Sequence, residues 1–318
     1  MFPGRSHQKV HRRNRMSSTI HVPVMASEVL QMGQPAEGQT WVDGTGGGGG
    51  HSQLLWRQLG ARGRLLIVDR DPVAVDRLSQ QFPSDVQVRH ARYDQVPELL
   101  EQIGWPAVDG VLLDLGLSSD QLADRERGFS FQWDGPLDMR FDPTEGESAW
   151  QWLAKVDERT LADAIFQYGE ERFSRRIARC VVERRRKEKI QTAAQLRELI
   201  YSCVPAGRPS KQGRKHGRVD PATRTFQALR IVVNQELSIL DRAMRLLPNC
   251  LATGGRLMVI SFHSLEDRIV KQALRSDPRL EQVTKKPVPA SLQEISQNPR
   301  SRSAKLRVAC RVEDSPEC

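Results

Sequence analysis

Apolar runs and amphipathic helical patterns alternate along the first third of the chain. Nearly continuous apolar strands separated by helices are typical of a parallel sheet that is covered on both faces, so we expect an α/β fold. In such a sheet, ligands bind outside the carboxyl ends of the strands. The expected strands are residues 40–43, 64–69, 86–90 and 108–115, and the expected helices lie near 52–59, 72–81 and 96–103.

The pattern changes from about Gly128 and returns to the α/β type near residue 220. Helical patterns lie around 149–156, 159–168, 171–186 and 193–202, with no strand signal between about 145 and 220. A helix over 220–237, a strand over 256–261, a polar loop over 276–302 and a final strand over 305–311 follow. We therefore expect a discontinuous α/β domain and a helical insert. The expected limits are 19–127 with 221–312 for the α/β domain, 128–220 for the insert and 1–18 for a disordered basic tail.

Composition points to a soluble protein of the cytoplasm. The chain has 318 residues, 38% of them hydrophobic, which suits about two globular domains. No apolar run approaches the roughly 20 residues that a membrane span requires, and the polar N-terminus is not a secretory signal. The five cysteines include no C-x-x-C pair, so we expect a reducing compartment rather than a disulfide scaffold or a zinc cluster.

The charge is +9, from 48 basic and 39 acidic residues, and an excess of this kind favours a polyanionic partner. Nine Lys or Arg stand against three Glu between residues 171 and 189, and a second basic cluster covers 208–218. A solvated charged helix is the alternative interpretation. The candidate phosphate-binding residues are Arg175, Arg176, Arg184, Arg185, Arg186, Lys187, Arg214, Lys215 and Arg218.

A glycine-rich loop between Asp43 and His51 lies where the first strand ends and a helix begins. It contains G-x-G-x-x-G in the strand–loop–helix context that the pattern requires. Glycines let a ligand approach the main chain, and the helix N-terminus presents free N–H groups. The loop therefore predicts a nucleotide-type cofactor site, with a flexible linker as the alternative. Asp43 and His51 would bracket that site.

Polar residues follow the next strands. Asp69 ends the second strand about twenty residues past the glycine loop, where a carboxylate accepts hydrogen bonds from ribose hydroxyls. The competing role, a helix cap, suits Asp71 better because Pro72 follows it. Tyr93 has two interpretations, an adenine-stacking surface or a core tyrosine. Asp114 ends the fourth strand, either as a functional carboxylate or as a turn cap.

Other chemistries lack their motifs in this sequence. It contains no G-x-x-x-x-G-K-[ST], no H-E-x-x-H or Cys/His spacing for a metal, and no G-x-S-x-G. An adenosyl cofactor and a nucleic-acid substrate account for the glycine loop, the acids and the basic insert. An NAD-dependent oxidoreductase and a non-catalytic RNA-binding or ribosome-assembly protein are the alternatives.

Motifs along residues 21–312 resemble one family closely. They include Leu112-Leu-Asp-Leu-Gly-Leu-Ser-Ser119, Asp134-Gly-Pro-Leu-Asp-Met-Arg140, Ala222-Thr-Arg-Thr-Phe-Gln-Ala228 and Ile260-Ser-Phe-His-Ser-Leu-Glu-Asp-Arg-Ile-Val-Lys271. The chain is similar to the bacterial S-adenosylmethionine-dependent methyltransferases that modify the cytosine N4 amine of a cytidine in 16S ribosomal RNA near the decoding centre. The resemblance implies a Rossmann-like methyltransferase sheet with an inserted helical domain that engages RNA. By position, it assigns cofactor contacts to Gly49, Gly50, His51, Asp69, Tyr93, Asp114 and Gln121.

The sequence departs from that family at a few positions. Tyr93 stands where Phe is common, and Asp220 replaces the usual His before Pro-Ala-Thr-Arg-Thr, which puts any RNA contact of that His in doubt. Methyl transfer to an amine needs a nearby acceptor for the N–H, for which we expect Asp114 first and His263 second. The implied partner is 16S ribosomal RNA or the small ribosomal subunit, with no DNA and no membrane. Formation of a homodimer is a further possibility that the sequence does not decide.

Overall fold

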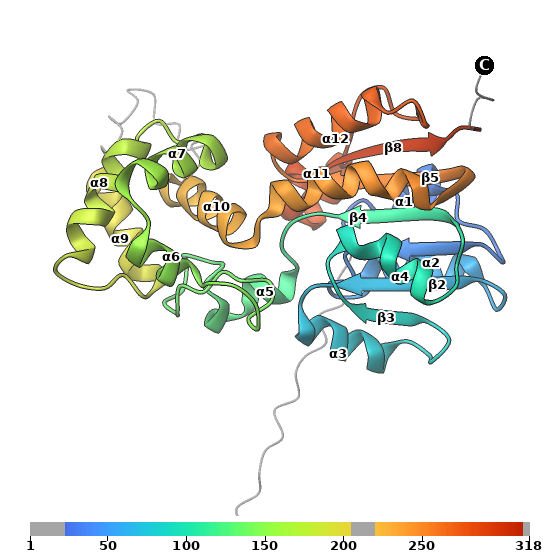
Figure 1. Ribbon diagram of the computed structural model, residues 1–318, viewed down its shortest axis with the longest axis horizontal. Helices are drawn as coiled ribbons and strands as arrows, with labels where there is room; N and C mark the ends of the chain where they lie inside the picture. Colours follow the sequence, from blue (N-terminus) through green and yellow to red (C-terminus); the bar gives the residue numbers. More distant parts are fainter. Residues whose placement is uncertain (1–22, 205–219, 314–318) are drawn as a thin grey trace, which may run out of the picture.

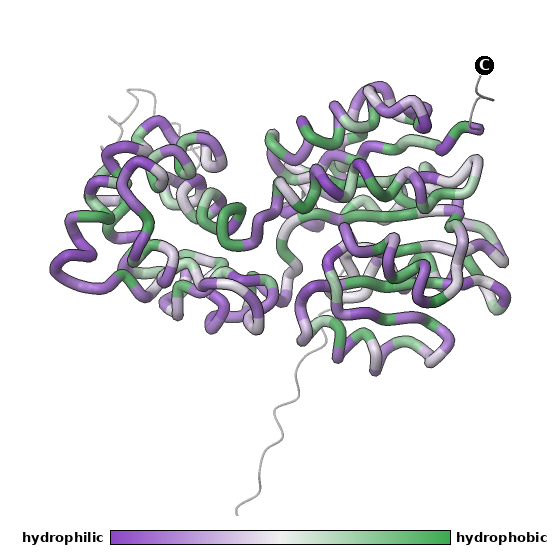
Figure 2. Tube along the Cα trace, in the orientation of Figure 1, coloured by the Kyte–Doolittle hydropathy of each residue, from purple (hydrophilic) through white to green (hydrophobic). Residues whose placement is uncertain are grey.

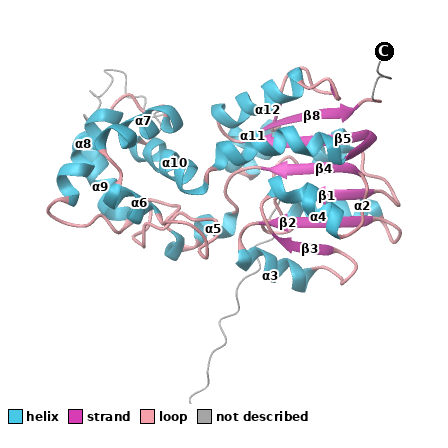
Figure 3. Ribbon diagram, viewed as in Figure 1, coloured by secondary structure: helices cyan, strands magenta, loops and turns pink. Residues whose placement is uncertain are grey.

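The computed structural model describes residues 23–204 and 220–313. The expected tail at 1–18 and the basic cluster at 208–218, with Arg214, Lys215 and Arg218, lie outside the described residues. The described chain forms a sheet-containing lobe and a helical lobe, with every labelled strand in the first (Figures 1 and 3).

One sheet carries the first lobe, with the strand order β3-β2-β1-β4-β5-β8-β6 and β7 paired to β8. Strands β1 to β5 are parallel, and β8 runs antiparallel to β5. The expected Rossmann-like α/β fold is confirmed. The strands are β1 Thr40–Asp43, β2 Arg64–Asp69, β3 Gln87–His90, β4 Val108–Asp114, β5 Leu251–Ser261, β6 Leu280–Gln282, β7 Val288–Pro289 and β8 Lys305–Arg311.

Helices cover both faces of the sheet because its strands are apolar on both sides. In β2, Leu65 and Ile67 pack into one hydrophobic cluster and Leu66 and Val68 into the other, as the two-residue repeat of a strand requires. Green strands between mixed green and purple helices show the same division in Figure 2. The first face carries α1 Ala26–Gly33, α2 Gly50–Leu59 and α3 Pro72–Gln81; the second carries α4 Val96–Gln102, α11 Glu236–Leu246 and α12 Ser264–Ser276.

The helical lobe has its own hydrophobic core, which includes Leu161, Ile177, Leu196 and Phe226. A disulfide joins Cys180 to Cys203 within it, which the sequence did not predict, since the scattered cysteines favoured free thiols. Because α10 packs against α7 in this core, we now propose Gln235 rather than residue 220 as the limit of the insert. The lobe consists of α6 Ala149–Lys155, α7 Glu158–Gly169, α8 Ser174–Arg185, α9 Ala193–Cys203 and α10 Pro221–Asn234.

The sequence expectations fail in three places. Residues 276–302 are not simply a loop: they hold β6, β7, helix α13 (Leu292–Gln297) and a turn of 3₁₀-helix over Pro299–Ser303. These elements are too short for a periodic signal, and β6 and β7 depend on pairing with β8. The expected helix over 220–237 breaks at Gln235, whose φ is 52°, and β5 begins five residues before the expected strand.

Among the described residues, the helices are all too short or too polar to cross a lipid bilayer.

Candidate active site at the carboxyl edge of the sheet

The glycine loop is a fixed turn rather than a flexible linker. The N–H of Gly44 donates to the carbonyl of Leu112 in β4, and that of Gly46 to the carbonyl of Val68 in β2, both at 2.9 Å. A Cβ at Gly44 would lie 2.5 Å from Cδ2 of Leu113. Gly49, which precedes α2, has a φ of 82°, in the left-handed region that favours glycine. The main chain of the loop is therefore held against both neighbouring strands.

Asp43 stabilises the loop from behind. Its carboxylate accepts hydrogen bonds from the Ser52 hydroxyl at 2.6 Å and the Thr45 N–H at 3.1 Å. The side chain is fully buried, and this burial raises the pKa of Asp43. Asp43 and Gly49 do not reach the surface of the adjoining cavity, whereas Gly50 and His51 do.

Asp69 lies at the end of β2 and faces the same cavity. Its two oxygens accept N–H bonds from Gly47 at 2.6 Å and from Asp71 at 2.8 Å. Burial raises the pKa of Asp69 to about 6, although both hydrogen bonds oppose the shift. Asp71 caps α3 by accepting the N–H of Val73, as the sequence indicated. The ligand role of Asp69 stays a prediction.

Asp114 and His51 form an ion pair at the centre of the site. The Nδ1 atom of His51 lies 3.4 Å from Oδ2 of Asp114, and Nε2 lies 2.8 Å from the carbonyl of Val24. Burial disfavours the imidazolium, but Asp114, Asp43 and the carbonyl of Val24 together outweigh this effect, and the pKa of His51 is raised. The other oxygen of Asp114, Oδ1, is buried and has no hydrogen-bond partner among the described residues. A buried acceptor of this kind calls for a ligand donor.

A cavity of about 550 Å³ connects these groups, within the range of about 300–1,000 Å³ that is usual for small-molecule sites. Tyr93 lies in its wall, where burial raises the pKa of the phenol and keeps it neutral. Gln121 donates to Asp71 at 3.0 Å and lines the same cavity. The residues present fit an adenosyl cofactor, because the cavity combines a ribose-type acid, an aromatic ring, open main chain and an unpaired acceptor. The predicted residues that line it are Gly50, His51, Asp69, Tyr93, Asp114 and Gln121.

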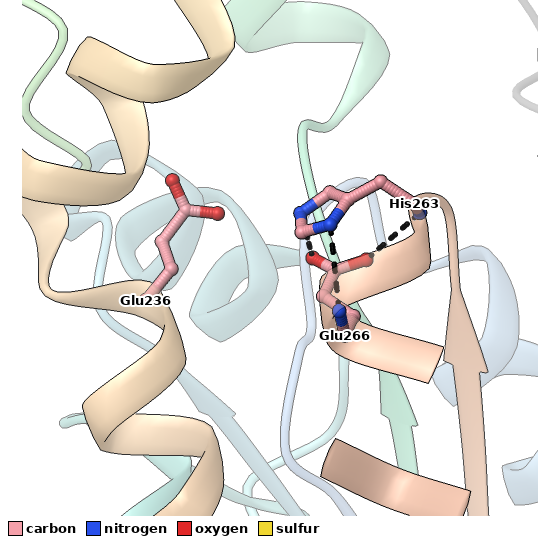
Figure 4. A group of neighbouring side chains, drawn as sticks. All are labelled: Glu236, His263 and Glu266. Carbon is pink, nitrogen blue, oxygen red and sulfur yellow. Dashed lines mark hydrogen bonds and ion pairs between the residues drawn. The ribbon is translucent and has the colours of Figure 1, made fainter. Parts of the chain in front are cut away.

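His263 lies outside this cavity, beside Glu236 and Glu266, which do line it (Figure 4). His263 and Glu266 form a capping box at the start of α12, in which each side chain accepts the other's backbone N–H. Burial alone would raise the pKa of Glu266, but the contacts with His263 and Arg230 bring it below the ordinary value. The ligand-type atoms of the three residues lie within 4.8 Å of one another. Arg230, however, donates to both oxygens of Glu236 at 2.8 Å and supplies the positive charge that a metal would bring.

A second cavity, of about 560 Å³, lies between the two lobes. Leu117, Ala123, Phe262 and Arg300 line both cavities. The second cavity is rich in aromatic side chains, and its polar residues include His263 and Arg230. Sequence patterns did not point to this cavity, because its walls come from segments far apart in the chain.

The basic residues of the insert divide into two groups. Arg175, Arg176, Arg186 and Lys187 are exposed on or just after α8. Arg185 instead donates to the backbone carbonyls of Leu153 and Val156 at the end of α6, and Arg184 pairs with Glu188. The first group is therefore the better candidate for phosphate contacts.

Sequence reasoning missed Arg230, Glu236 and Arg300. Glu236 follows the left-handed Gln235, which no pattern marked, and Arg300 comes from the segment expected to be a loop. The pairing of His263 with Glu266 did have a signal, since a polar residue three positions before a Glu at a helix start is the spacing of a capping box.

The fold and the cavity at the carboxyl edge of its sheet fit an S-adenosylmethionine-dependent methyltransferase. The comparisons agree: residues 18–312 match the MraW methylase family, and the chain belongs to that family. Ribosomal RNA small subunit methyltransferase H of Rhodopirellula baltica is 47% identical over 309 residues, which cover 93% of each chain. The protein of the same name from Deinococcus radiodurans is 48% identical over 292 residues, which cover 92% of this chain and 90% of the relative.

Among solved structures, a putative rRNA-methylase from Clostridium thermocellum matches 90% of this chain and 95% of its own. Its TM-score is 0.44 at 11% identity, which is too low to add to the assignment.

Proposed function

We propose that this protein transfers a methyl group from S-adenosylmethionine to the exocyclic N4 amine of a cytidine in 16S ribosomal RNA, near the decoding centre. The named relatives support ribosomal RNA of the small subunit as the substrate. The resemblance of the motifs supports the cytosine amine and its location. Such an enzyme works in the cytoplasm, where ribosomal subunits are assembled.

The observation that carries this proposal is the unpaired Oδ1 atom of Asp114. The cofactor supplies a methyl group on a positively charged sulfur. Transfer of that methyl group from sulfur to the N4 lone pair would leave N4 positively charged, so the amine would have to lose one proton. Oδ1 of Asp114 accepts an N–H of the amine and then its proton. Orientation supplies much of the remaining acceleration, up to about 7–11 kcal/mol in well-oriented systems.

His51 positions this acceptor. Held between the carbonyl of Val24 and Oδ2 of Asp114, it fixes the orientation of the carboxylate and balances its charge. His263 is the weaker candidate, because Nδ1 already accepts the N–H of Glu266 at 3.4 Å and the proton of the neutral ring is therefore assigned to Nε2. A ring nitrogen that carries a proton cannot accept another.

The test is methyl transfer from radiolabelled S-adenosylmethionine to small ribosomal subunits, with wild-type protein and Asp114→Asn. The variant should lose about 10²–10⁴-fold in turnover, the range of general acid–base catalysis, while its affinity for S-adenosylmethionine stays close to wild type. Asp76→Asn, which changes an exposed carboxylate on α3, is the matched control. Wild-type turnover of Asp114→Asn would refute the acceptor role, and lost cofactor binding would reassign Asp114 to the cofactor.

The same assay separates the alternatives. Membership of a methylase family removes the oxidoreductase hypothesis. A wild-type protein that binds ribosomal RNA and the cofactor but transfers no methyl group to any form of the small subunit would favour the non-catalytic assembly protein.

We further propose that the exposed Arg175, Arg176, Arg186 and Lys187 contact RNA phosphates. Their position on the helical lobe and the net charge of +9 support this role.

A further inference from the structure

Aromatic side chains line the second cavity. Phe129, Phe131, Trp133, Phe226 and Phe262 line it, and Phe131 meets Phe226 edge to face at 5.3 Å. Its volume of about 560 Å³ lies within the usual range for small-molecule sites. Aromatic walls of this kind bind unstacked nucleobases, because every base presents a π face. Trp133 is 45% exposed and lies under the guanidinium of Arg125, so one wall is open to solvent.

This cavity adjoins the cofactor cavity on the side of the proposed acceptor. Leu117, which follows β4 by three residues, and Phe262, which follows β5 directly, line both spaces. Asp114 pairs with Ile260 in the β4–β5 register, and His263 comes three residues after Ile260. An amine at the boundary of the cavities would therefore lie near Asp114 with its ring in the second cavity.

His263 contributes a hydrogen-bond donor to the second cavity. Its Nδ1 accepts the backbone N–H of Glu266, so the ring proton is assigned to Nε2. That nitrogen is buried and lies 3.1 Å from Oε1 of Glu266, with which it forms an ion pair, and it makes no hydrogen bond to the described residues. A buried donor that is held in a ligand-sized cavity by a charge partner alone can bond an acceptor on the ligand.

We propose that the second cavity receives the target base, extruded from the RNA, and that the Nε2–H of His263 donates to ring nitrogen N3 of cytosine. This inference rests on the proposed methyl transfer to N4. Extrusion is the general solution of enzymes that act on a base. Cytosine presents N3 as an acceptor beside its N4 amine, whereas uracil presents an N3–H that would face the Nε2–H. His263 is thus a residue that positions the base and discriminates between pyrimidines.

The decisive experiment combines a protein variant with a base analogue. His263→Asn removes the imidazole donor and keeps a residue type that caps a helix N-terminus well, so α12 should still form. The substrates are reconstituted small subunits whose 16S RNA carries cytidine or 3-deazacytidine at the target position. The analogue keeps the N4 amine and the carbonyl oxygen but replaces N3 by a C–H group.

Wild-type protein should lose about 5- to 150-fold in kcat/KM on the analogue, the range of a base-edge contact. His263→Asn should lose a similar factor on cytidine and little more on the analogue, because both changes remove the same hydrogen bond. Equal penalties for the analogue in both proteins would overturn the inference while leaving the proposed function intact. Absence of wild-type methyl transfer to cytidine would instead refute the proposed function.

A second measurement tests the cavity without touching α12. Trp133→Ala should raise KM for the small subunit about 5- to 150-fold, the range of base–aromatic stacking, and leave the affinity for S-adenosylmethionine unchanged. Phe166→Ala, which changes a 61% exposed aromatic on α7 outside both cavities, is the matched control. Equal effects of the two variants would contradict a stacking role for Trp133.

Discussion

Protonation of Asp69 should control cofactor affinity between pH 7 and pH 5. The pKa of this carboxyl is raised to about 6 by burial. About 90% of the protein therefore carries the carboxylate at pH 7, and about 10% does so at pH 5. If the ribose hydroxyls donate to that carboxylate, the apparent Kd scales with the inverse of the ionised fraction. The Kd for S-adenosylmethionine should then rise about tenfold over this interval.

The direction in which Asp69 changes stability with pH shows that weaker cofactor binding at low pH would not reflect unfolding. A carboxyl with a pKa above its unfolded value of 3.8 binds protons more tightly in the folded state. Its contribution to stability therefore increases as the pH falls through 6 and approaches its limit below 3.8. Weaker binding at pH 5 cannot come from unfolding driven by Asp69. His51, whose pKa is raised, stays positively charged at pH 5.

Isothermal titration calorimetry of wild type and Asp69→Asn across this pH interval tests the assignment. The variant should bind about 10- to 150-fold more weakly at pH 7, the equivalent of about 1.5–3 kcal/mol for hydrogen bonds to a charged group, and lose the pH dependence. Because Asn offers one acceptor oxygen for the N–H groups of Gly47 and Asp71, thermal melting of the variant must accompany the titration. A tenfold pH effect that survives in a folded Asp69→Asn protein would refute the role of Asp69.

Three further changes have defined outcomes. Replacing Arg175 and Arg176 by Gln should lower the slope of log affinity for ribosomal RNA against log salt by about 1.4, or about 0.7 per lost phosphate contact, whereas Arg57→Gln on α2 should not change it. Gly44→Ala places a Cβ 2.5 Å from a neighbouring side chain; urea unfolding should report a loss of about 1–3 kcal/mol, and an unchanged midpoint would contradict the tight packing. The side chain of Asn234 is 1% exposed; its amide oxygen accepts the backbone N–H of Phe141, and its amide nitrogen donates to the carbonyl of Met139. Asn234→Ala should therefore cost about 2–4 kcal/mol in the same assay, and a loss below 0.5 kcal/mol would count against that bridge.

The sheet was predictable because its determinants are local. Nearly continuous apolar runs predicted β1, β2 and β4 to within a residue, and the acids at their ends could be placed at one edge from the parallel topology alone. The boundary between α10 and α11 could not be predicted, because the break at Gln235 is a single left-handed residue in a continuous helical pattern.

The chemistry of the site depended more on tertiary contacts. That Asp69 faces the cavity while Asp71 caps α3 could be inferred from Pro72. The burial of Asp43, the unpaired oxygen of Asp114 and the proton position on His263 follow from neighbours that are distant in sequence. No local pattern encodes them.

The position of the insert in the topology connects the two cavities. The helical lobe leaves the sheet after β4 and returns through α11 to β5, and these two strands are neighbours. The insert begins after the carboxyl end of β4 and ends just before Glu236, the first residue of α11, which lines the cofactor cavity, so both junctions lie at the edge of that cavity. An insert at this point places α10 and residues 129–133 beside Leu117 and Phe262. Under the proposed function, one lobe would therefore have two tasks, which are contact with RNA through its basic surface and formation of a wall of the cavity next to the proposed acceptor.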